Sequence, residues 1–167
     1  VGSQEKGGLV FQPLMLIDQM DERIWAHEWV LGLLTNENID IVPEIKEATW
    51  EALNHLSSVP KNQRTLTGLK AFIQDVRIRQ ALDTYCMGGP FGMMLDSDHE
   101  NFYDRDWQCF EMAEIMSMPK VVAPVLSYIF HVIEKRLDGR PTMMILDEAW
   151  LFLDHPLFAH KIKAWLK

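Results

Sequence analysis

The sequence has few cysteines, no long apolar run and no excess of positive charge. Its two cysteines, Cys86 and Cys109, have neither the spacing of a metal site nor enough partners for a disulfide framework. No stretch of about 18 apolar residues occurs, so we expect no transmembrane segment. The formal net charge is −8, from 16 basic and 24 acidic side chains. DNA and RNA binding require clustered basic side chains, so we do not expect this chain to bind DNA by itself.

What the chain does contain is the composition of a folded domain. Hydrophobic residues make up 48% of it and charged residues 24%, which are ordinary values for a globular protein. Its 167 residues are enough to bury a core, so we expect one domain or a large part of one. Residues 154–166 have the pattern of a helix that stops at Lys167 without a capping residue. We therefore expect the chain to be a truncated piece.

Residues 18–85 have the pattern of an all-helical block. In its first part, Trp25, Trp29 and Leu33 recur every four residues, as on one face of an amphipathic helix. The pattern ends near Tyr85 and is followed by a Gly-Gly-Pro breaker. Four residues that favour the start of a helix precede the successive apolar stripes: Asp18, Pro43, Thr65 and Asp75.

The pattern changes after this block. Residues 107–112 alternate as in a strand, and residues 124–138 carry an apolar helical stripe. Residues 142–147 begin with an unbroken apolar run, which is typical of a strand buried on both faces. Two parallel strands joined by a helix form a βαβ crossover. The sequence therefore predicts an α/β fold with an all-helical insertion.

Two adjacent carboxylates, Asp147 and Glu148, end the second predicted strand. Ligands of open α/β sheets bind at this edge of the sheet. A carboxylate there can hold a Mg²⁺ ion that bridges nucleotide phosphates, and the next side chain can polarise the attacking water. In this Walker B arrangement Asp147 would bind the metal, directly or through water, and Glu148 would be the catalytic base. On spacing alone, a solvated strand end is an equally good interpretation.

The residues around this pair resemble a known family. Two segments closely resemble the ATPases of type IV secretion and conjugal DNA transfer, above all the TrbE and VirB-type subgroup: GRPTMMILDEAWLFL at 139–153 and VAPVLSYIFHVIEKRLD at 122–138. Upstream, GGPFGMMLDSDHENF and WQCFEMAEIM are similar to the two segments that precede this helix in the family. GLVFQPL and IWAHEWV are similar to the stretch that follows the family's P-loop region. The resemblance covers residues 8–167.

The resemblance implies part of a RecA-like P-loop NTPase core, made of residues 8–17 and 86–167, with the helical insertion at 18–85. It implies ATP and Mg²⁺ as ligands, with Asp147 and Glu148 at the nucleotide and Glu148 as the catalytic residue. It also implies a cytoplasmic motor, peripheral to the bacterial inner membrane, that works with other type IV secretion subunits and forms a homo-oligomer, a hexamer. Such a motor hydrolyses ATP to drive pilus assembly or substrate transfer.

The sequence departs from the family in one respect. The pattern G-x-x-x-x-G-K-[ST], whose amides and lysine cradle nucleotide phosphates, is absent. The pairs Gly7-Gly8 and Gly88-Gly89 are not followed by Gly-Lys-Ser or Gly-Lys-Thr. We therefore expect the chain to carry the metal and base half of an ATP site and to be inactive by itself.

An acidic stretch after the Gly-Gly-Pro breaker invites a different interpretation. Asp96, Asp98 and Glu100 alternate like the start of a calcium-binding loop. Asn101 and Trp107 occupy the positions where that loop requires Gly and Glu. We therefore expect a polar loop and no calcium site.

Other functions remain open. The helical block could be a docking module for other channel subunits, although we expect its tryptophans, Trp25, Trp29 and Trp50, to be core anchors. The motor could also be one that pumps DNA, through a basic loop outside this chain. The sequence does not single out an arginine that would reach a neighbour's γ-phosphate among five candidates: Arg64, Arg77, Arg79, Arg105 and Arg140.

Overall fold

The computed structural model describes residues 9–100, 107–110, 113–145 and 159. These residues fall into two compact units, one within residues 1–110 and the other within residues 111–167. All regular secondary structure in the described residues is helical, and none of them lies in a strand. The predicted insertion boundaries, residues 18 and 85, do not coincide with this division, and the partition into core and insertion stays a prediction.

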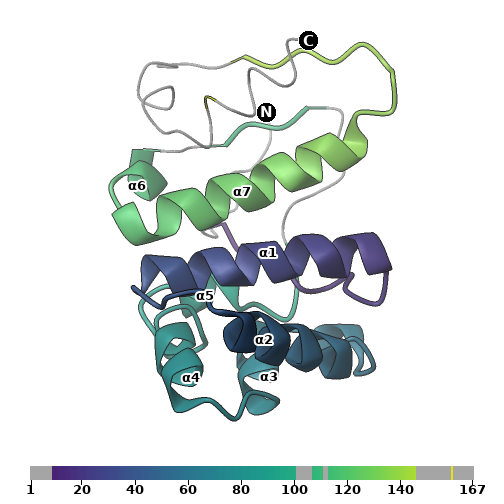
Figure 1. Ribbon diagram of the computed structural model, residues 1–167. Helices are drawn as coiled ribbons and strands as arrows, with labels where there is room; N and C mark the ends of the chain where they lie inside the picture. The colour runs from purple at the N-terminus through teal and green to yellow at the C-terminus, as the bar shows by residue number, and fades with distance from the viewer. Residues whose placement is uncertain (1–8, 101–106, 111–112, 146–158, 160–167) are drawn as a thin grey trace. The chain divides into compact units, whose positions relative to one another are not determined.

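The described part of the first unit is built around four helices, which Figure 1 shows as one group. α1 (Met20–Asn36) packs against both α2 (Pro43–Leu56) and α4 (Val76–Asp83). α3 (Leu66–Ala71) packs against the same two helices, so the four enclose a common core. Two short pieces complete the group: the 3₁₀ helix η1 (Lys61–Gln63) and α5 (Gly92–Leu95).

Three of the four predicted helix starts are confirmed. Pro43 is the first residue of α2. An amide at this position would have no acceptor within the helix, so the lack of one in proline costs nothing. The Thr65 hydroxyl caps α3 by accepting a hydrogen bond from the Gly68 amide at 3.1 Å. The Asp75 carboxylate caps α4 by accepting one from the Arg77 amide at 2.8 Å.

The predicted cap at Asp18 is wrong. α1 begins at Met20, and Gln19 occupies the capping position without a side-chain hydrogen bond to the helix. The Asp18 carboxylate instead forms an ion pair with the guanidinium of Arg64. A partner 46 residues away therefore competes successfully with the local capping position.

Aliphatic side chains from all four helices form the core of this unit. Burying each of them contributes roughly 1.5–3 kcal/mol to stability. Trp29 is also buried, as predicted, and its ring stacks on that of Trp25 with 5.9 Å between centroids, whereas Trp25 and Trp50 remain partly exposed. The largest fully buried side chains are Phe11, Leu14, Ile17, Leu33, Leu34, Ile45, Leu53, Leu56, Leu66, Leu69, Ile78 and Tyr85.

The segment before α1 is joined to the segment after α5. The Phe11 amide donates to the Met94 carbonyl at 2.7 Å, and the Ser97 amide donates to the Phe11 carbonyl at 3.3 Å. Residues 11 and 94–97 thus lie side by side although 83 or more positions separate them in the chain. The two ends of the helical group are therefore held together at this point.

The described part of the second unit consists of α6 (Ala113–Met116) and α7 (Pro119–Arg136), which contact each other. The predicted start of this long helix at Pro124 is wrong, because Pro119 takes the first position and Pro124 lies inside the helix with its ring buried. Proline at position six removes one helical hydrogen bond, yet the helix continues through it. Among the described residues, no helix combines the length and the apolar character needed to cross a membrane.

The two predicted strands are not formed in the parts of them that the structure describes. Residues 107–110 and 141–145 have no regular secondary structure. A strand exists only through hydrogen bonds to a neighbouring strand, and the described residues contain none to pair with. The predicted positions 111, 112, 146 and 147 lie outside the described residues.

Candidate functional site

The predicted catalytic and metal-binding residues, Asp147 and Glu148, lie outside the described residues. The apolar approach to them, residues 141–145, is described and exposed, with Met143 at 82% and Ile145 at 72% of full exposure. Apolar side chains of this size are rarely left in water over several consecutive residues. The segment therefore has the surface of an element that packs against something further.

A turn with left-handed backbone leads into this approach. Gly139 has a φ of 92°, which a residue with a side chain rarely adopts. Next to it, the Arg140 guanidinium lies 2.9 Å from the Asp138 carboxylate. This hydrogen bond from Arg140 lowers the pKa of Asp138. The turn between α7 and the predicted strand is thus closed by local contacts.

The Gly-Gly-Pro breaker forms a second and tighter turn, between α4 and α5. Gly88 has a φ of 92°. A Cβ atom on Gly89 would lie 2.0 Å from the Asp83 carbonyl oxygen, and one on Gly92 would lie 2.0 Å from the Cys86 carbonyl oxygen. Only glycine fits at these two positions, because both clashes are with backbone atoms.

Four backbone amides of this turn, those of Met87, Gly89, Phe91 and Gly92, are already engaged. The Met87 amide donates to the Asp96 carboxylate at 2.5 Å, and the Gly89 amide donates to the Cys86 carbonyl at 2.8 Å. The Phe91 amide donates to the Thr84 carbonyl at 3.2 Å. A phosphate-binding loop needs several free amides that converge on one point. The turn is a glycine-rich structure of a different kind, and it is not built to cradle phosphate.

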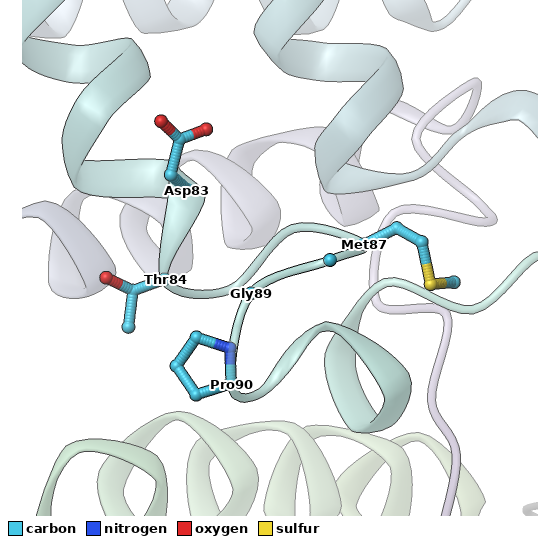
Figure 2. Close-up of a pocket in the computed structure, with 6 residues that line it drawn as sticks. Asp83, Thr84, Met87, Gly89 and Pro90 are labelled. Carbon is cyan, nitrogen blue, oxygen red and sulfur yellow. The ribbon is translucent and has the colours of Figure 1, made fainter.

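A shallow depression of about 540 Å³ lies beside this turn. Figure 2 shows it, with the Met87 side chain extending away from Asp83, Thr84 and Pro90. Among the described residues that line it, Asp83 alone has an ionisable side chain, and it is paired with Lys70. The depression therefore offers no converging charges for a nucleotide.

Asp96 is the most deeply buried carboxylate among the described residues, at 3% exposure. Its Oδ1 accepts from the Thr67 amide at 2.9 Å, and its Oδ2 accepts from the Thr67 hydroxyl and the Met87 amide. Asp98, in contrast, is exposed and bonds to the ring of His99 at 2.8 Å. The two residues thus face different ways, and Asp96 has the role of a buried connector.

The two cysteines differ in their surroundings. Cys86 is buried beside Thr67 and Asp96, and burial raises the pKa of its thiol to about 12. Cys109 is exposed. Because the thiolate is the reactive form, Cys86 is protected from modification as long as the turn stays closed.

The five arginines considered for reaching a neighbour's γ-phosphate differ in burial and pairing. Arg64 is buried, and its guanidinium donates to the carbonyls of Val59 and Met15, so it cannot reach a neighbouring subunit. Arg77 is paired with Asp75, and Arg140 with Asp138. Arg79 is exposed. Arg105 lies outside the described residues.

Sequence reasoning missed the buried polar residues Gln12, Arg64 and Asp96 as connectors. Each of the three has at least one partner 29 to 52 positions away along the chain, and no local pattern indicates that partner. In the described part of the chain, no group of three or more His, Cys, Asp or Glu side chains could hold a metal ion. The predicted Mg²⁺ ligand is outside that part.

Comparison with known proteins relates the chain to two groups of named relatives, although no family model matches it. It is 36% identical over 166 residues to a probable conjugal transfer protein TrbE of Sinorhizobium fredii, an alignment that covers 99% of this chain and 25% of that protein. It is 36% identical over 171 residues to the conjugal transfer protein TrbE of Rhizobium radiobacter, covering 99% of this chain and 21% of that one. It is 26% identical over 140 residues to the type IV secretion system protein virB4 of Bartonella quintana, covering 81% and 18%.

The extent of these alignments differs sharply between the chain and its relatives. Nearly the whole chain is matched by TrbE proteins, but it spans only about a quarter of their length or less. The match therefore does not rest on one short motif. By its sequence the chain is similar to a segment of the TrbE proteins of conjugal transfer and of the VirB4 proteins of type IV secretion.

Proposed function

We propose that this chain is part of an ATP-hydrolysing motor of a type IV secretion or conjugation system and supplies the Walker B half of its ATP site. The observation that carries this proposal is the 36% identity to TrbE proteins over 99% of the chain. The alignment includes the apolar run that ends in Asp147 and Glu148, because so little of the chain lies outside it. The motor would energise pilus assembly or substrate transfer.

In this proposal the two carboxylates have different tasks. Asp147 would hold Mg²⁺, directly or through water, and the bound ion would supply positive charge at the ATP phosphates. Glu148 accepts the proton of the attacking water and is the catalytic residue. The fold around them would be a RecA-like α/β core, in which residues 142–147 become a central strand. The exposed apolar side chains of 141–145 support this, since a central strand buries both faces.

The phosphate-binding loop would come from another part of a longer protein. Two observations support this: the sequence has no G-x-x-x-x-G-K-[ST] pattern, and the amides of Met87, Gly89, Phe91 and Gly92 in the glycine turn are engaged internally. The longer protein would be a homo-oligomer, a hexamer, that works in the cytoplasm against the inner membrane with other secretion subunits. The chain by itself would not hydrolyse ATP.

Replacing Glu148 by Gln in the longer protein tests the catalytic assignment. The substitution keeps the shape of the side chain and removes its basicity, so ATP turnover should fall by about 10²–10⁴-fold while ATP binding persists. Glu51→Gln, on the exposed face of α2, is the matched control and should change neither. Turnover within a few-fold of the unsubstituted protein would show that Glu148 is not the base.

Calorimetric titration of the 167-residue chain with Mg-ATP tests the division of the site. A site that lacks its phosphate-binding half should give no measurable heat of binding at micromolar ATP. Tight binding would mean that other residues of this chain replace the P-loop, and the proposed division would be wrong.

One observation favours a second function, in which the helical block is a docking module. Large apolar side chains are exposed on its surface, with Met20 and Ile24 on α1 and Val76 at the start of α4. A pull-down with the longer protein, with and without residues 18–85, tests this function. Loss of every secretion partner together with unchanged ATP turnover would favour docking over a motor role for the block.

A further inference from the structure

We infer that three buried polar side chains clamp the helical block to the segments on either side of it, so that block and flanks move as one rigid lever. The clamp consists of Gln12, Arg64 and Asp96 with their hydrogen-bond partners. All three side chains act on residues 59–67, which comprise most of the connection between α2 and α3 and the first two residues of α3. The mechanical role of this clamp rests on the proposed motor function, but the clamp itself does not.

Gln12 ties the preceding segment to this connection. Its side-chain amide donates to the Lys61 carbonyl at 2.5 Å and to the Arg64 carbonyl at 3.4 Å. Gln12 is almost fully buried, so water cannot replace these acceptors while the structure is closed. The segment before α1 therefore cannot move away from residues 61–64 without leaving buried polar groups unpaired.

Arg64 makes the same connection from the other side. Its Nε donates to the Val59 carbonyl at 2.9 Å, and its Nη1 donates to the Met15 carbonyl at 3.0 Å and pairs with Asp18. A buried guanidinium needs its acceptors even more than a neutral amide does. Gln12 and Arg64 thus lock residues 12–18 and 59–64 to each other reciprocally.

Asp96 ties the following segment to the same connection. It holds both the amide and the hydroxyl of Thr67 at the start of α3, and it holds the Met87 amide in the glycine turn. Backbone hydrogen bonds between Phe11 and residues 94–97 also join the preceding segment directly to the following one. Three segments far apart in sequence, around residues 12, 64 and 96, therefore meet at one place.

This arrangement has a mechanical consequence. An insertion that works as a mobile arm needs pliable junctions where it leaves and rejoins the core. Here both junctions, residues 12–18 and 87–96, are held by hydrogen bonds of buried charged or amide side chains. Opening either junction would leave several buried polar groups without hydrogen-bond partners at the same time. When the flanking segments are displaced, α1–α4 therefore move with them, because the junctions do not bend.

Thiol labelling of the 167-residue chain measures how often the clamp opens. Cys86 is buried next to the Asp96 contacts and should react slowly with a maleimide, while the exposed Cys109 reacts fast and serves as an internal reference. Thr67→Val removes the hydroxyl that bonds to Asp96 and keeps the amide. Burial raises the pKa of the Cys86 thiol, and a hydrogen bond with the Thr67 side chain lowers it, so losing the hydroxyl does not by itself make the thiol more acidic. A faster Cys86 reaction in this variant would therefore report opening of the turn.

Gln12→Leu tests whether the three contacts act as a unit. The Gln12 side chain bonds to the carbonyls of Lys61 and Arg64, at a different point of the clamp from Cys86. Loss of these bonds should therefore expose the Cys86 thiol only if the contacts of the clamp open together. We expect at least a tenfold faster Cys86 reaction in both Thr67→Val and Gln12→Leu, with Cys109 unchanged. Asp98→Asn, at an exposed neighbour of Asp96, is the control and should have no effect.

Two results would overturn the inference. Unchanged labelling of Cys86 in both variants would mean that these contacts do not hold the turn closed. Faster labelling in Thr67→Val alone would mean that the contacts act separately and that the block and its flanks are not one body. If either variant fails to fold, as judged by circular dichroism, Thr67→Ala and Gln12→Met remove the same side-chain hydrogen bonds and give the same comparison.

The longer protein then tests the lever role. Thr67→Val and Gln12→Leu should leave ATP turnover within about twofold and reduce substrate transfer at least tenfold, because hydrolysis continues without transmission. Transfer that survives alongside faster Cys86 labelling would overturn the lever role. A longer protein with no ATP turnover at all would instead refute the proposed function, while the labelling result for the clamp would stand.

Discussion

The helices between residues 20 and 83 and the segment at 141–145 differ in where their backbone partners lie. A helical amide finds its acceptor four residues earlier in the same segment, so α1 and α2 are complete once their own residues are present. Residues 141–145 include three large apolar side chains, Met143, Met144 and Ile145, yet all five residues are exposed. Any strand that they form must obtain its partners from elsewhere in the protein.

The difference shows which parts of a domain can be separated from the rest. A helical group that also buries its apolar face can stand alone, as α1–α4 do around their shared core. A central strand has neither its hydrogen bonds nor its burial without neighbours. The same chain thus contains a self-sufficient region and an unsatisfied one.

Substitution of core and segment residues should give the largest contrast between the two regions. Leu53→Ala, in the fully buried core, should lower the free energy of unfolding by about 2–5 kcal/mol because it leaves a cavity. Ile145→Ala should change it by less than about 0.5 kcal/mol. Urea unfolding of the 167-residue chain, followed by circular dichroism, measures both. Equal losses of unfolding free energy in the two variants would show that residues 141–145 are packed in solution. The proposed difference between the two regions would then be wrong.

The glycine turn at the end of the self-sufficient region should show the next largest effect. Gly92→Ala places a methyl group against the Cys86 carbonyl and should destabilise the chain by about 1–3 kcal/mol. Gly32→Ala, in α1, has open space around its new methyl group and should stabilise it by about 0.5–1 kcal/mol. Thermal unfolding of both variants gives the sign directly. A neutral Gly92→Ala would mean that the turn relaxes easily.

A smaller effect should distinguish the helix starts. Thr65→Ala removes the cap of α3 and should cost about 1 kcal/mol. Gln19→Ala, at the start of α1, removes no capping bond and should cost close to nothing. Both are measured by urea unfolding. Similar losses at the two sites would mean that the α3 cap contributes nothing beyond a surface side chain.

Tyr85 should give an effect similar in size to the loss of the α3 cap at neutral pH, and a distinct effect in alkali. Burial, together with the nearby charge of Glu37 and the hydrogen bond to it at 3.1 Å, raises the pKa of Tyr85 from 10.0 to about 12. Because the neutral phenol is favoured in the folded state, its contribution is complete below pH 10 and is lost as the pH rises toward 12. Tyr85→Phe should lower stability by about 0.5–1.5 kcal/mol at pH 7 and remove this part of the alkaline loss. Unfolding measured from pH 8 to 11 checks it, and an unchanged alkaline slope would contradict the assignment.

The sequence was most informative where structure depends on neighbours along the chain. It predicted the helices of 18–85, and it located the starts at Pro43, Thr65 and Asp75 from single residue types. It failed at Asp18, where a distant arginine captures the expected cap, and at Pro124, where an earlier proline starts the helix. The first error comes from a distant contact that a local pattern does not contain, whereas the second comes from two prolines five positions apart that both suit a first helical turn.

The candidate site follows the same rule in a different way. Asp147 and Glu148 were identified because a short motif and its surroundings resemble a family, and their placement stays a prediction. The buried connectors Gln12 and Asp96 were missed because polar residues usually lie at the surface, and nothing nearby in sequence indicates their acceptors and donors. A motif can be recognised because its residues are adjacent in the sequence. The partners of Gln12 and Asp96 come together only in the folded chain, so the sequence alone does not indicate them.

The long reach of Gln12 has a consequence for the order in which the protein is made. Its second acceptor, the carbonyl of Arg64, lies 52 residues further along the chain. At ribosomal speeds of about 5–20 residues per second, roughly 3–10 s pass between the synthesis of the two. During that interval α1 and α2 can already form, because helices need only their own residues. The segment around Gln12 therefore stays undocked while α1 and then α2 are made, and a chaperone that recognises apolar extended segments would find Phe11 and Leu14 available during that time.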